Sequence, residues 1–183
     1  HDNDRLAARG KRRARLRTAL AAMLPHQGAF GITAGVEWFA AEKIDVHGAP
    51  SLNWDAADNQ VAAVARLNAL LAIHPAFGPG AAVALVQTGP GNVLAILRTP
   101  PGGAAPLLAL ANLDCERPQT VCWPAGHFPP AGTTAAWDLL TGETFAPGVS
   151  ADAVRAFDLE PGQLRCLATD AAVKDVYDLA GRL

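Results

Sequence analysis

The sequence contains little cysteine, methionine or tyrosine, with three, one and one of these among its 183 residues. Cys115, Cys122 and Cys166 form no Cys-x-x-Cys pair, so their spacing predicts neither a disulfide framework nor a zinc site. No apolar run is long enough for a membrane span, and no Gly-rich nucleotide loop ending in Gly-Lys is present. We therefore expect reduced thiols, a cytoplasmic location, no membrane partner, and neither a metal nor a cofactor.

An excess of one charge is also lacking, since the formal net charge is −2. This balance gives no general electrostatic reason to expect a nucleic acid partner. One basic run does stand out, and it alternates with apolar residues at helical spacing. A solvated helix face is the simpler interpretation, and a phosphate or anionic-lipid site is the alternative. The run consists of Lys11, Arg12, Arg13, Arg15 and Arg17.

Half of the residues are hydrophobic, which suffices for a packed core. Periodicity predicts helix over residues 5–23, with Gly10 marking a turn between two helical pieces. A second helix is predicted over residues 61–73, where His74-Pro75 ends it. Between the helices, residues 29–35 are apolar and bounded by glycines, which predicts a strand buried on both faces. The order loop, helix, strand is half of a β/α repeat.

After residue 78 the pattern changes to short apolar segments separated by Gly and Pro turns. Strands at a spacing of roughly ten residues predict an antiparallel β-sandwich. The predicted strands cover residues 81–87, 92–98, 107–112, 119–123, 133–139, 144–145, 154–159 and 163–168. We therefore place a boundary near residue 78 and expect a short helix or tail over residues 170–183.

Candidate acid and base groups gather at the start of the chain, where His1, Asp2 and Asp4 share one loop. Glu37 follows the predicted strand and can face the same cleft. Two or more carboxylates with a His suit glycoside chemistry, although an Asp before a helix is also a common cap. Trp123 and Trp137 have two interpretations as well, either a sugar-stacking surface or residues of the sandwich core.

Several motifs stand in an order that resembles the C-terminal third of the α-amylase superfamily, glycoside hydrolase family 13. Those enzymes have a His-Asp pair after the seventh barrel strand, a helix rich in Arg, Leu and Ala, and an eighth strand ending Gly-x-Glu. A last barrel helix ending His-Pro-Ala and a β-sandwich follow. The matching segments here are His1-Asp2, 12–24, 31–37, 67–77, Leu110 to Asp114, Asp138 to Glu143 and Leu159 to Gly162.

Within the superfamily, the chain looks most like the maltosyltransferase branch that extends α-1,4-glucans from maltose 1-phosphate. The residues that carry this likeness are 17–24, 31–37, Glu42-Lys43, 139–144 and 159–162. The segment from Trp38 to residue 44 is short for that branch, and the first four residues look more like ordinary amylases. The donor sugar therefore stays open.

The resemblance implies an α+β fragment, in which the last β/α units of a (β/α)8 barrel over residues 1–77 precede a β-sandwich over residues 78–169. It implies that Asp2 is the carboxylate that stabilises the transition state. His1, Glu37 and Lys43 would bind substrate, an α-glucan or maltooligosaccharide. The nucleophilic Asp and the general-acid Glu would lie upstream in the same barrel, so the upstream part of its own barrel is an expected partner.

Three interpretations follow for function. The first is the C-terminal portion of a retaining α-glucan hydrolase or glycosyl-transferring enzyme, inactive on its own because nucleophile and acid are missing. The second is a non-catalytic carbohydrate-binding or structural β-sandwich, and the third is an unrelated interaction module. The chain begins with His rather than Met, so we expect its natural start to lie upstream, and a removed signal peptide stays open.

Overall fold

The computed structural model describes residues 4–26, 29–43, 45, 47–48, 51–89, 91–131, 133, 135–146 and 153–169. Two α-helices lie in this part of the chain, α1 over Lys11–Met23 and α2 over Val61–Ile73, with a 3-10 helix over Leu6–Arg9 ahead of α1. Gly10 separates the 3-10 helix from α1 with a φ of 100°, which confirms the predicted turn. Shorter 3-10 turns cover Pro75–Phe77 and Pro101–Gly103.

The described strands are all paired antiparallel, as the sequence predicts. Six of them form one sheet in the order β1-β2-β3-β8-β5-β6, and β4 pairs with β7 in a second sheet. The last strand β8 is inserted between β3 and β5, an order that no local pattern announces. The bounds are β1 Ala82–Leu85, β2 Val93–Thr99, β3 Leu107–Asn112, β4 Gln119–Pro124, β5 Ala136–Asp138, β6 Thr144–Phe145, β7 Val154–Leu159 and β8 Leu164–Ala168.

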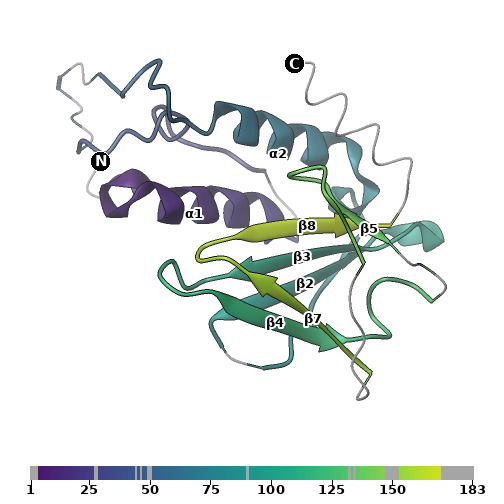
Figure 1. The fold of residues 1–183 in the computed structure, drawn as a ribbon. Coiled ribbons are helices and arrows are strands. Elements are labelled where there is room, and N and C mark those ends of the chain that lie inside the picture. The colour runs from purple at the N-terminus through teal and green to yellow at the C-terminus, as the bar shows by residue number, and fades with distance from the viewer. Residues whose placement is uncertain are drawn as a thin grey trace.

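The elements stack in three layers, with α1 and α2 over one face of the larger sheet and the β4–β7 pair over the other (Figure 1). Strand β3 is buried along its whole length because both of its faces are covered. Leu107 and Ala109 pack in the core under the helices, whereas Leu108 and Leu110 pack in the core against β4 and β7. This alternation is the period of a strand between two apolar layers.

The predicted strand over residues 29–35 is wrong for this structure, because residues 29–33 have no regular conformation and turns cover 34–39. A strand needs a neighbour to accept and donate ladder hydrogen bonds, and no described strand runs beside this segment. The barrel units expected over residues 1–77 are therefore not confirmed. The proposed boundary near residue 78 stays a prediction, and α1, α2 and the sheet share one core. The helix or tail expected over 170–183 lies outside the described residues.

Arg98 joins the helix layer to the sheet. It belongs to β2, is 1% exposed, and donates hydrogen bonds to the carbonyl oxygens of Ala76, Met23 and Pro25, each at 2.9 Å. Its guanidinium carbon lies 4.4 Å from the centroid of the Phe77 ring. Burial lowers the pKa of Arg98, the direction expected when a cation leaves water. Because two of the acceptors lie at the end of α1, the cation also faces the negative end of that helix dipole.

We expect Arg98→Met to lower the free energy of unfolding by about 2–4 kcal/mol, since it leaves the carbonyls of Ala76, Met23 and Pro25, two of them in buried hydrogen bonds, without their donor. Urea denaturation followed by circular dichroism measures the loss. Arg9→Met, at an exposed site on the 3-10 helix before α1, serves as the control and should change stability by less than about 0.5 kcal/mol. Equal stability of the two variants would contradict the role given to Arg98.

Candidate functional site

The turn over residues 34–40 carries Glu37, and Gly35 gives this turn its shape. Gly35 has a φ of 92°, and a Cβ built on it would lie 3.0 Å from the Cβ of Ala40 and 3.1 Å from Nη1 of Arg5. Arg5 is buried and donates from Nη1 to the carbonyl oxygen of Ala34 at 2.8 Å. The glycine of the Gly-x-Glu motif is therefore required by backbone conformation and by close approach.

Gln60, directly before α2, fixes the Glu37 turn against α1. Its backbone N–H donates to the carbonyl oxygen of Glu37 at 2.8 Å, and its buried side-chain amide donates to the carbonyl oxygen of Val36 at 2.9 Å. The same amide donates to the hydroxyl of Thr18 on α1 at 3.2 Å. Glu37 itself is half-buried, and its Oε2 atom is buried with no hydrogen-bond partner within the described residues.

A second loop, residues 51–56, folds back beside this turn. Glu42 holds it by accepting from the backbone N–H of Leu52 at 2.7 Å. Asn53 donates from its side chain to the carbonyl oxygen of Trp38, also at 2.7 Å. Leu52, Asn53, Asp55 and Phe39 all have φ between 54° and 60°, a region that costs energy for residues other than glycine. Several left-handed residues in so short a span mark a loop whose shape is imposed by its surroundings, which is common at functional sites.

Two indole rings meet between these loops. The ring centroids of Trp38 and Trp54 lie 5.9 Å apart with their planes tilted by 58°. Trp38 is half-buried, and its indole N–H is a buried donor without a partner in the described part of the chain. Trp54 is 56% exposed, although a tryptophan usually gains by burial.

The basic face of α1 is partly used within the fold. Lys11 and Arg15 both bind the carboxylate of Asp58, each at 2.7 Å, and both lie over the ring of Phe39. The Lys11 hydrogen bond, supported by the charge of Arg15, lowers the pKa of Asp58. These two cations therefore hold α1 to the loop before α2, which favours the structural interpretation for this part of the basic run.

A cleft of about 360 Å³ opens beside the start of the described chain. Its lining includes Arg5, Arg17 and Thr18, together with residues 31–33 and Val36. The Nε atom of Arg5 is buried there without a hydrogen-bond partner among the described residues. The cleft thus combines cationic and hydroxyl groups next to the Glu37 turn.

The structure places two of the four sequence-predicted site residues. Glu37 lies half-buried on its turn, and Lys43 is exposed on the segment that follows. His1 and Asp2 lie outside the described residues, so their approach to Glu37 stays a prediction. Sequence reasoning missed the exposure of Trp54 and the contacts of Gln60, since exposure and contacts across the chain leave no local pattern.

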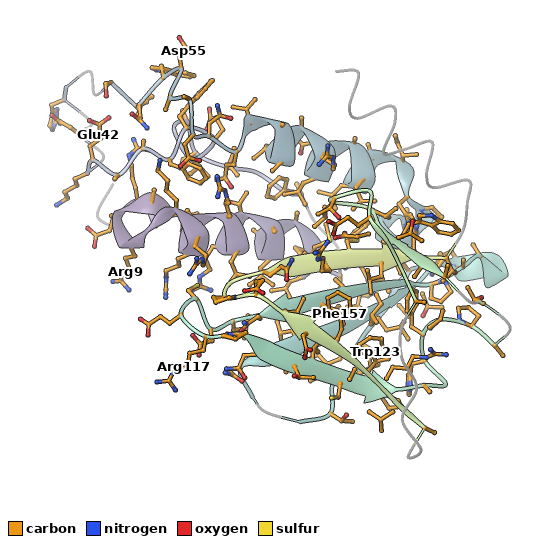
Figure 2. The ribbon with its side chains drawn as sticks, viewed as in Figure 1. Arg9, Glu42, Asp55, Arg117, Trp123 and Phe157 are labelled. Carbon is orange, nitrogen blue, oxygen red and sulfur yellow. The ribbon has the colours of Figure 1, made fainter. Side chains whose placement is uncertain are left out.

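Other features settle open points of the sequence. Trp123 is 0% exposed and donates its indole N–H to the carbonyl oxygen of Phe128, which confirms the core interpretation for this residue. Figure 2 shows Trp123 and Phe157 by the strands, far from Asp55 and Glu42 on the loops. Among the described residues, no group of three or more potential ligands could hold a metal, and no helix is long and apolar enough to cross a membrane.

Comparison with known proteins finds similar structures but no similar sequence. No family model and no curated protein sequence matches the chain. The fold is similar to that of enzymes of the α-amylase family. A maltogenic alpha-amylase, AmyB from Thermotoga neapolitana, superposes with a TM-score of 0.72 at 13% identity, over 92% of this chain and 39% of that one. The gamma-CGTase from alkalophilic Bacillus clarkii has a TM-score of 0.62 at 19% identity, over 92% and 25%.

The chain thus spans less than half the length of the enzymes it matches. At these identities the likeness shows the fold alone. It confirms that two helices and antiparallel sheets, predicted here from sequence, match part of an α-amylase-family structure.

We expect Gln60→Leu to loosen the Glu37 turn, because it removes the side-chain amide that donates to the carbonyl oxygen of Val36 and to the hydroxyl of Thr18. The hydrogen-bonded amides of Val36, Trp38, Phe39 and Ala40 should exchange with solvent at least about tenfold faster, for a local loss of about 1–2 kcal/mol. Hydrogen exchange read by NMR measures this. Gln119→Leu, on the distant strand β4, should leave these four amides unchanged. Unchanged amide exchange rates in Gln60→Leu would show that the turn is stable without the Gln60 side chain.

Proposed function

We propose that this chain is the C-terminal portion of a retaining enzyme that hydrolyses or transfers α-glucans. The observation that carries the proposal is the match of 92% of the chain to a maltogenic α-amylase at a TM-score of 0.72. The ordered motifs of the sequence point to the same family independently of that match. Folds alone host many activities, so the residues of the site must carry the chemistry.

The roles proposed for the site residues are those that the resemblance to the α-amylase superfamily implies. Asp2 would stabilise the positive charge that develops on the sugar, and His1 would donate hydrogen bonds to sugar hydroxyls. Both residues stand just before Asp4 and Arg5, which line the cleft beside the Glu37 turn. Glu37 would complete the substrate-binding side of that cleft. Lys43, exposed on the segment after the turn, would contact the glycone.

The remaining catalytic groups would come from the upstream part of the same barrel. A retaining mechanism needs one carboxylate that attacks the anomeric carbon and a carboxylic acid that protonates the leaving oxygen. Water or a second sugar then displaces the enzyme carboxylate, and the acid, now a base, takes the proton of the incoming hydroxyl. An upstream partner also explains why Arg5 Nε and Glu37 Oε2 are buried without partners in the described part of the chain.

The finer assignment proposed here is the maltosyltransferase branch, in which maltose 1-phosphate is the donor and an α-glucan the acceptor. Support comes from the motif residues Gly31 to Glu37 and from Glu42-Lys43, which stand on the described turn and the segment after it. Glu42 holds the loop that carries Trp54, so this motif has a defined structural task. We also keep the expectation of a reducing, cytoplasmic location.

The test uses the natural gene product. Intact mass spectrometry of the protein from its source should give a mass several times the 19.0 kDa of this chain. In that product, Asp2→Asn should lower kcat on maltooligosaccharides by about three orders of magnitude or more, with unchanged thermal stability, because transition-state stabilisation is lost. Glu116→Gln, at an exposed carboxylate before β4 and away from the cleft, is the control and should retain full activity.

The 183-residue chain alone should have no turnover of maltooligosaccharides or maltose 1-phosphate. A natural product near 19.0 kDa, or full activity of Asp2→Asn, would refute the enzyme proposal. Turnover by the isolated chain would refute the statement that nucleophile and acid lie upstream.

A further inference from the structure

We propose that Trp54, backed by Trp38, is a stacking platform for glucose rings of an α-glucan chain. This inference rests on the function proposed above and adds a binding position that the site residues named there do not include. Indole rings are large, flat and apolar, and the ring hydrogens of a pyranose present a matching apolar face. The platform would bind a sugar outside the cleft beside the Glu37 turn.

The exposure of Trp54 is the first argument. Trp54 is 56% exposed and lies on a loop, so more than half of its surface is open to solvent. Trp123, by contrast, is fully buried in the core and bonded through its indole N–H. Leaving a tryptophan uncovered forfeits the free energy of burial, which is commonly recovered when a ligand or partner covers the ring.

The loop that carries Trp54 is held in place by hydrogen bonds to neighbouring segments. The Asn53 side chain bonds to the carbonyl oxygen of Trp38, and Glu42 binds the backbone of Leu52 on the other side. Leu52, Asn53 and Asp55 surround Trp54 with left-handed backbone, at φ of 54°, 55° and 60°. A loop that only connects two elements has no need of such costly conformations. A binding surface benefits, because an ordered platform loses little entropy when a ligand binds.

The relation of the two rings bears on the shape of the ligand. Their planes are tilted by 58° at a centroid distance of 5.9 Å, so the two rings do not form a coplanar pair. α-1,4-linked glucose chains curve, because each axial linkage turns the next ring, whereas β-1,4-linked chains are flat ribbons that suit coplanar aromatic rings. Because these two rings are not coplanar, they suit an α-glucan better than a flat, cellulose-like chain.

Polar groups beside the rings suit a sugar better than an apolar partner. Asp55 and Asn53 flank Trp54 in the sequence and are both exposed, and Figure 2 shows Asp55 on the outer edge of the loop. Carboxylate and amide groups at the rim of an aromatic surface provide acceptors and donors for sugar hydroxyls, as in most ligand sites. A protein-docking surface would be expected to bring more apolar neighbours to the rim.

The experiment titrates the 183-residue chain with maltoheptaose to about 10 mM and follows the indole N–H signals by proton–nitrogen NMR. We expect the Trp54 signal to shift saturably and the signal of buried Trp123 to stay in place. Trp54→Ala should weaken binding at least about tenfold, and Trp54→Phe, which keeps an aromatic face, by no more than about threefold. Leu85→Ala removes a side chain that is 62% exposed on β1, and should leave the affinity unchanged.

Several results would overturn the platform. They are no binding of maltoheptaose, equal affinity of Trp54→Ala and the wild type, or equal affinity for cellohexaose. None of these results touches the mass or the Asp2→Asn kinetics of the natural gene product. Failure of the platform is therefore distinguishable from failure of the proposed function. The platform would be established if the Trp54 signal shifts with maltoheptaose and if, among the three variants, only Trp54→Ala loses binding.

Discussion

One buried cation ties this structure together. Arg98 rises from β2 and donates to the carbonyl oxygens of Met23 and Pro25 at the end of α1 and of Ala76 in the turn after α2. No carboxylate forms an ion pair with it in the described residues. Three carbonyl dipoles, the negative end of α1 and the face of Phe77 stabilise its charge instead. A buried charge tolerates little displacement of its acceptors, so this group fixes both helix ends against the sheet.

The candidate site depends on that fixed arrangement. Because α1 and α2 are held side by side, Gln60 before α2 can bond at once to Thr18 on α1 and to the Glu37 turn. Lys11 and Arg15 reach Asp58 from the same helix and tighten the contact at the other end. The Glu37 turn has no sheet to support it in the described chain, and side-chain hydrogen bonds take over the task that a ladder would perform.

The similarity to α-amylase-family structures at 13% and 19% identity shows that very different sequences adopt this fold. A sheet covered on one side by two helices and on the other by a strand pair needs apolar residues at the right periods, and many sequences satisfy that. Function demands more than the fold. Within the described residues, buried atoms of Glu37 and Trp38 on the turn, and of Arg5 packed against it, have no hydrogen-bond partner.

The sequence by itself determined the helix over 61–73, the break at Gly10 and the ranges of most strands, because periodicity, glycine and proline act over a few residues. It predicted a strand over 29–35 from apolar character alone, and the structure has none there, since a strand exists only beside a partner. Only tertiary structure decided that β8 lies between β3 and β5, that Arg98 is buried, and that Trp123 is covered while Trp54 is open. Those outcomes depend on contacts between segments that are distant in the sequence, and no local pattern predicts such contacts.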